Sequence, residues 1–137
     1  PQQFMHGHFS AEDLIRQGDE VVLFSNLFWK WKHPFYDAVF AHHWFMYSLA
    51  GVSDLSPAGV EDQRKLWLDA IFGLSQVRET ENGLCLVKAA LLERALAGLL
   101  VDSLAYIDEG NPLAEYMVSS TRNQVSKLTD ELLTGQN

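Results

Sequence analysis

Proline and glycine signals divide this chain into segments that are each about as long as one helix. His33-Pro34, Ser56-Pro57 and Asn82-Gly83 mark these divisions, because proline suits the first turn of a helix and Asn-Gly favours a turn. Between them, apolar residues recur at helical spacing and no alternating strand pattern is evident. The pattern predicts an all-α fold, a compact bundle of about five helices in a single domain over residues 1–137.

The expected bounds of these helices follow from their caps. Ser10 should cap a first helix that runs to Lys32, and residues 1–9 should form a flexible N-terminal segment. The second and fourth helices are apolar around most of their circumference, so we expect them to be the most buried. The other four helices are expected from Pro34 to Gly51, from Ser56-Pro57 through Leu74, from Leu84 to Ile107, and from Pro112 to Gly135.

The balance of charges argues against several classes of partner. The chain has 18 Asp and Glu against 10 Lys and Arg, a formal net charge of -8. Because phosphate binding needs a face rich in Lys and Arg, we expect no nucleic-acid partner. The most apolar segment, residues 89–107, is interrupted by Glu93, Arg94 and Asp102, so we expect no membrane span either.

Cysteine and histidine usage gives no indication of a metal or cofactor. Cys85 is the single cysteine, which excludes an intramolecular disulfide and a multi-cysteine zinc site. A reducing, cytoplasmic location is compatible with this and is expected. His6 and His8 lie close together, but no Glu-x-x-His or His-Glu-x-x-His motif occurs. We therefore expect no metal and no cofactor.

Aromatic residues are concentrated around the second expected helix, since three of the four tryptophans lie between Phe28 and Tyr47. Such rings either fill the core, which is the commoner case, or are covered by a partner chain or a flat ligand. Our first hypothesis is a small acidic protein-binding or regulatory domain, which self-associates as a dimer or binds a protein partner through this helix. The candidate partner- or ligand-binding residues are Trp29, Trp31, Phe35, Tyr36, Phe40, His42 and Trp44.

Two alternatives use some of the same residues. In the first, the chain is a sensor or carrier for a hydrophobic or flat small molecule, in a pocket lined by Phe35, Phe40 and Trp44 with His42 as the polar contact. In the second, His42 and Glu93 are the acid/base pair of a small enzyme, which requires their side chains to lie within hydrogen-bonding reach. No strong catalytic motif occurs, so we favour binding over catalysis and assign no catalytic residue.

Lys30, Lys32 and His33 form the one local positive cluster of this acidic sequence. We interpret them as cations at the end of the first expected helix, where they would complement its dipole and its unpaired carbonyl groups. The alternative is capture of a small anion, with Trp29 or Trp31 beside it.

Overall fold

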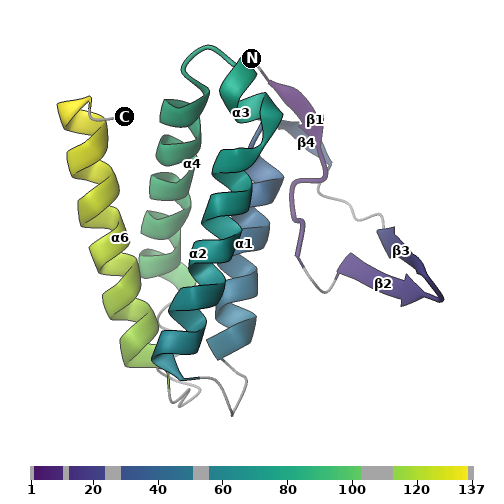
Figure 1. The fold of residues 1–137 in the computed structure, drawn as a ribbon, viewed down its shortest axis with the longest axis horizontal. Coiled ribbons are helices and arrows are strands. Elements are labelled where there is room, and N and C mark those ends of the chain that lie inside the picture. Colours follow the sequence, from purple (N-terminus) through teal and green to yellow (C-terminus); the bar gives the residue numbers. More distant parts are fainter. Residues whose placement is uncertain (1, 11–12, 24–28, 51–55, 103–112, 136–137) are drawn as a thin grey trace.

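The structure, a computed structural model, describes residues 2–10, 13–23, 29–50, 56–102 and 113–135, and only the backbone of residues 47–50 and 102. Within these residues the chain is mostly helical, in agreement with the sequence pattern (Figure 1). The helical elements are α1 (Tyr36–Ala50), α2 (Pro57–Gly73), α3 (Ser75–Glu79), α4 (Gly83–Ala97), the π-helical segment η2 (Gly98–Asp102) and α6 (Ala114–Thr134).

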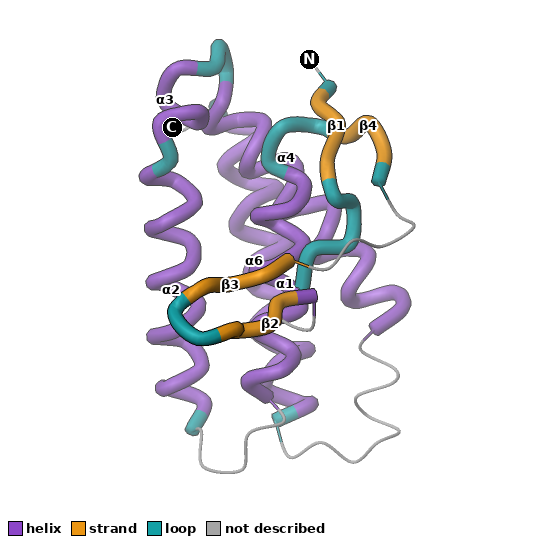
Figure 2. The backbone as a smooth tube through the Cα atoms, turned by 90° about the vertical axis from the view of Figure 1, so that its right-hand side faces the viewer, coloured by secondary structure: helices purple, strands orange, loops and turns teal. Residues whose placement is uncertain are grey.

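The first predicted helix, from Ser10 to Lys32, is wrong, because the described part of this region forms strands (Figure 2). β1 (Gln3–Met5) pairs with β4 (Lys30–Lys32) in an antiparallel ribbon, and β2 (Leu14–Gln17) pairs with β3 (Glu20–Leu23) in a hairpin. Gly18 lies in the hairpin turn with a φ of 64°, a conformation that glycine adopts without strain. The β-branched residues on either side of this turn favour a strand over a helix.

The β1–β4 ribbon is joined to the first turn of α1 through Asp37. The backbone amides of His6 and Gly7 donate to Oδ2 and Oδ1 of its carboxylate, both at 2.8 Å. Gly7 is buried and has a φ of 80°, which lets the chain turn closely against α1. We expect residues 1–9 to be a flexible segment; in the structure residues 3–5 pair with β4, and His6 and Gly7 make these two hydrogen bonds.

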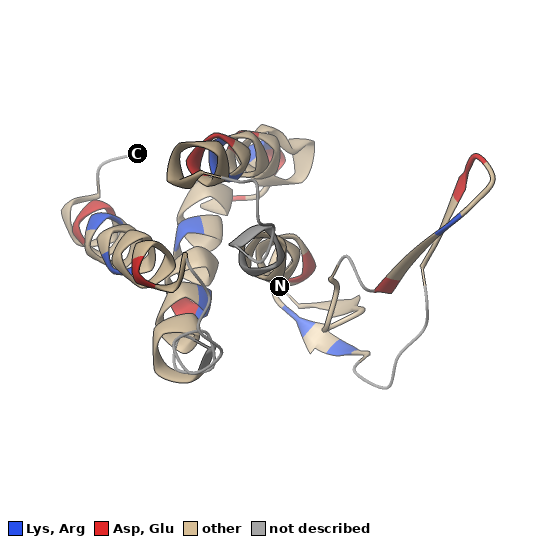
Figure 3. Ribbon diagram, turned by 90° about the horizontal axis from the view of Figure 1, so that it is seen from below, with Lys and Arg blue, Asp and Glu red and all other residues tan. Residues whose placement is uncertain are grey.

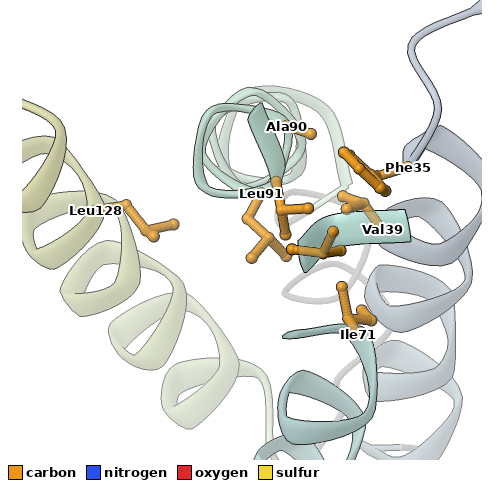
Figure 4. Packing of buried hydrophobic residues seen from close by; sticks show 8 residues of the cluster. Phe35, Val39, Ile71, Ala90, Leu91 and Leu128 are labelled. Carbon is orange, nitrogen blue, oxygen red and sulfur yellow. The ribbon is translucent and has the colours of Figure 1, made fainter. Parts of the chain in front are cut away.

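The helices pack around α4, which contacts both α1 and α6, while α2 contacts α1. α6 lies on the far side of the helices from the strands (Figure 1). Figure 4 shows Phe35 and Val39 directed toward Ala90 and Leu91 of α4, with Leu128 reaching in from α6. The buried members of this main core cluster are Phe35, Val39, Ile71, Val77, Val87, Ala90, Leu91 and Leu128.

Several helix ends lie where their caps predict. The hydroxyl of Ser56 accepts from the amide of Gly59 at 3.2 Å, Pro57 begins α2, and Gly135 ends α6 with a φ of 64°. The predicted helix ends at Gly51 and Ile107 and the predicted helix start at Pro112 lie outside the described residues. In the ranges that the structure describes, every helix is too short or too polar to cross a membrane.

Gly83 should be intolerant of any side chain. A Cβ atom at this position would collide with the backbone carbonyl oxygen of Val77, and backbone cannot move aside as a flexible side chain does. We expect Gly83→Ala to lower the free energy of unfolding by about 1–3 kcal/mol, measured by urea denaturation. Gly73→Ala, at the end of α2, is the matched control, because its Cβ would meet no atom within 4 Å. Equal effects of the two changes would contradict the close approach of α3 to α4.

Candidate functional site

An exposed aromatic surface lies on the β1–β4 ribbon, ahead of α1. Phe4, Trp29 and Trp31 have exposed fractions of 57%, 41% and 63%. Phe4 is the register partner of Trp31, and its ring centroid lies 5.8 Å from that of Trp31 and 5.7 Å from that of Trp29. Alternation along a strand places Trp29 and Trp31 on the same side of the ribbon. We call these three residues the aromatic face.

Two lysines accompany the aromatic face on β4, which Figure 3 shows as two positively charged positions on this strand. Lys30 is exposed, and the ammonium group of Lys32 lies 4.4 Å from the ring centroid of Tyr36. Our interpretation of these lysines as cations at a helix end is wrong, because they lie in a strand. The six residues of the ribbon strands contain no carboxylate, so the ribbon is locally cationic on an acidic chain.

The other predicted binding residues lie elsewhere. Phe35, Phe40 and His42 are buried among the helices, and Tyr36 and Trp44 are half-buried. The ring of Phe40 lies 5.8 Å from that of Tyr36 and 6.1 Å from that of Trp44, so these three form a row along α1. The seven candidates therefore divide between the ribbon, the interior and the boundary of α1, and do not make one surface.

The structure places His42 and Glu93 in different surroundings. His42 lines a cavity enclosed by α1, α2, α4 and α6, whereas Glu93 is exposed beside His33 and Tyr36. Burial, together with smaller contributions from the charges of Arg64 and His43, lowers the pKa of His42 to about 3. Glu93 acts instead on the pKa of His33, which it raises against a larger lowering by burial. This geometry gives no support to an acid/base pair of His42 and Glu93.

The cavity beside His42 has a volume of about 30 Å³. Nε2 of His42 is buried there and has no hydrogen-bond partner among the described residues. Of the four residues in the predicted ligand pocket, His42 alone lines this cavity; Phe40 lines a separate hollow on the side of His33. The pocket predicted from Phe35, Phe40, Trp44 and His42 is therefore not assembled as one space.

Next to the cavity, a hydrogen-bonded group joins α2 to α6. Arg64 donates to the Glu61 carboxylate from Nε at 2.8 Å and from Nη2, and the hydroxyl of Tyr116 donates to the same carboxylate at 3.2 Å. The bonds from Arg64 lower the pKa of Glu61, and burial raises the pKa of Tyr116. At neutral pH Glu61 is therefore an anion paired with Arg64, and Tyr116 keeps its proton.

A larger groove of about 680 Å³ lies between α2, α4 and α6. Lys88, which is buried, forms an ion pair with Glu131 at 3.0 Å in its wall. Sequence reasoning missed this groove, because α2 and α6 have ordinary amphipathic patterns. The space between these two helices depends on their positions relative to α4, which the sequence does not give. Five residues line both the groove and the cavity: Arg64, Leu91, Tyr116, Ser120 and Gln124.

In the described ranges, no three His, Cys, Asp or Glu side chains are placed together so as to hold a metal ion. No family model matches the sequence, and comparison with curated proteins and with solved structures also finds no match. Function is therefore inferred from the chain's own residues.

Proposed function

We propose that this chain is a protein-binding domain and that its contact surface is the aromatic face of the β1–β4 ribbon. The supporting observation is that three large rings, Phe4, Trp29 and Trp31, lie side by side and exposed. A contiguous apolar patch of this kind is typical of an interaction site, and tryptophan is among the residues that contribute most to binding energy. We therefore place the contact surface on the β1–β4 ribbon and not on α1.

The helices supply the scaffold in this proposal, as one compact domain in which α1 and α4 are the most buried elements. Asp37 anchors the ribbon to that scaffold through the amides of His6 and Gly7. A ribbon of two short strands has little stability by itself, so such an anchor is needed to present the rings in a constant arrangement. Preorganised rings lose less entropy on binding than mobile ones.

The partner that fits this surface is a protein segment with an apolar anchor and acidic neighbours. The ribbon strands carry Lys30 and Lys32 and no carboxylate, so acidic side chains beside the anchor would be attracted to it. The net charge of -8 by itself would favour a basic partner, but the charge of the ribbon favours an acidic one. Two copies of this chain would each carry a net charge of -8 and repel each other, so we favour a different protein over a second copy.

Selection from a displayed library of random twelve-residue peptides tests this proposal. We expect the enriched peptides to combine an aromatic or aliphatic residue with Asp or Glu. Trp31→Ala should weaken their binding at least tenfold, because it removes the most exposed ring of the aromatic face. Leu133→Ala truncates another exposed apolar side chain, 81% exposed on α6, and should leave binding unchanged.

Three outcomes would contradict the proposal. Peptides that bind wild type and Trp31→Ala equally would remove the aromatic face from the contact. Enrichment of Lys and Arg would contradict the proposed chemistry of the partner. Light scattering that shows a dimer of the wild type and a monomer of Trp31→Ala would assign the aromatic face to a second copy of the chain.

A further inference from the structure

The groove and the cavity carry a charge opposite to that of the whole chain. The chain has 18 Asp and Glu and 10 Lys and Arg, yet the two hollows are lined by four cationic and two anionic side chains. The cations are Arg64, Lys88, Arg94 and Lys127, and the anions are Glu61 and Glu131. Glu61 pairs with Arg64, and Glu131 pairs with both Lys88 and Lys127, so the lining keeps an excess of two positive charges. The local field therefore favours an anionic ligand.

The groove has the size and lining that the body of a small apolar molecule requires. Its volume of about 680 Å³ falls within the range of roughly 300–1,000 Å³ that is typical of ligand sites. α6 packs on α4 and α2 packs on α1, so α2 and α6 form opposite walls (Figure 1). The apolar side chains of the groove are Pro57, Ala58, Leu68, Phe72, Leu84, Leu91 and Leu128.

Polar groups with unused hydrogen-bonding capacity lie where the groove meets the cavity. Arg64 donates to Glu61 from Nε and Nη2, and within the described residues its Nη1 donates no hydrogen bond. Nε2 of His42, a side chain that is 5% exposed, also has no partner within those residues. A buried polar nitrogen without a partner is costly, so a ligand that pairs with it gains affinity.

From the charge, the apolar lining and these two groups, we infer that the groove binds a carboxylate with an apolar body, such as a fatty acid. The body lies between α2 and α6 above α4. The carboxylate accepts from Nη1 of Arg64 and extends into the cavity toward Nε2 of His42. A neutral imidazole that carries its proton on Nε2 donates to a carboxylate, and a guanidinium adds a charge-assisted bond. This site is separate from the aromatic face and does not depend on it.

Isothermal titration calorimetry with sodium decanoate and, in parallel, decan-1-ol tests the inference on the full chain. Both compounds have the same apolar body, and only decanoate has a carboxylate. We expect one saturable site for decanoate per chain and at least tenfold weaker binding of decan-1-ol, because the alcohol cannot form the charge-assisted bond. Absence of saturable decanoate binding, or equal affinity for the two compounds, would overturn the inference.

Matched variants locate the carboxylate. Arg64→Gln should weaken decanoate binding at least tenfold, whereas Lys65→Gln, an exposed neighbour on α2 that lines neither hollow, should leave it unchanged. Equal effects of the two changes would show that the carboxylate is not at Arg64. Circular dichroism shows whether each variant is folded.

A second pair of variants covers the case in which Arg64→Gln fails to fold. Gln124→Glu places a negative charge at the junction of the groove and the cavity and should weaken decanoate binding at least tenfold. Ser126→Glu adds the same charge at an exposed position of α6 away from both hollows, and should have no effect. Unchanged binding by Gln124→Glu would overturn the inference.

Discussion

Replacing Phe35 by alanine should lower the free energy of unfolding by about 3–5 kcal/mol. Phe35 is 2% exposed and packs in the main core cluster between α1 and α4 (Figure 4). Removal of its ring forfeits the burial of a large apolar surface and leaves a cavity that the helices can only partly fill. Because a domain of this kind has a total stability of about 5–15 kcal/mol, we expect a much earlier urea transition by circular dichroism.

Phe4→Ala is the matched control, since it is the same change at an exposed aromatic residue. Most of the Phe4 ring is already in water, so the variant loses little more than ring contacts with Trp29 and Trp31. We expect a loss of about 1 kcal/mol or less. A loss as large as that of Phe35→Ala would contradict the division of the predicted binding residues between the interior and the aromatic face.

His42 should make the protein less stable as the pH falls from about 6.5 toward 3. Burial lowers its pKa in the folded state from 6.5 to about 3, with smaller contributions from Arg64 and His43. Between these pH values the unfolded chain binds a proton that the folded chain does not. The contribution of neutral His42 is therefore complete above pH 6.5 and is lost as the pH falls through this window, by up to about 1.4 kcal/mol per pH unit.

His42→Phe isolates this contribution, because phenylalanine is similar in size and does not titrate. We expect the difference in the free energy of unfolding between wild type and variant to change by about 2–3 kcal/mol from pH 6 to pH 4, in the direction that favours the variant. His33 and the carboxyl groups are present in both chains, so their titration cancels in the difference. A difference that does not vary with pH would contradict a buried, neutral His42.

The helix caps could be predicted from the sequence because they depend on neighbouring residues. The hydroxyl of Ser56 bonds to an amide three residues later, and Pro57 and Gly135 act through their own backbone preferences. The region from Ser10 to Lys32 differs from its predicted helix although its apolar residues fit a helical period. Gly18 and the β-branched Val21 and Val22 favour a hairpin, and in the structure these local preferences prevail over the period.

The candidate sites could not be predicted from neighbouring residues as the helix caps could. Trp31 and Phe35 are both aromatic and only four residues apart, yet one is exposed on the ribbon and the other is buried against α4. Residue type and local spacing do not distinguish them, because exposure depends on which distant element covers each ring. The groove is even harder to predict. Its walls come from α2, α4 and α6, and the sequence of each helix taken alone does not indicate a groove.

The sequence by itself determined that this protein is mostly helical and where several of its helices begin and end. Those features rest on backbone hydrogen bonds and conformational preferences that act within about one helical turn. Only the tertiary structure decided which aromatic rings remain exposed, and that His42 and Arg64 line one cavity. Burial and charge pairing arise between residues that are far apart in the chain, such as Tyr116 and Glu61, and folding alone brings them together.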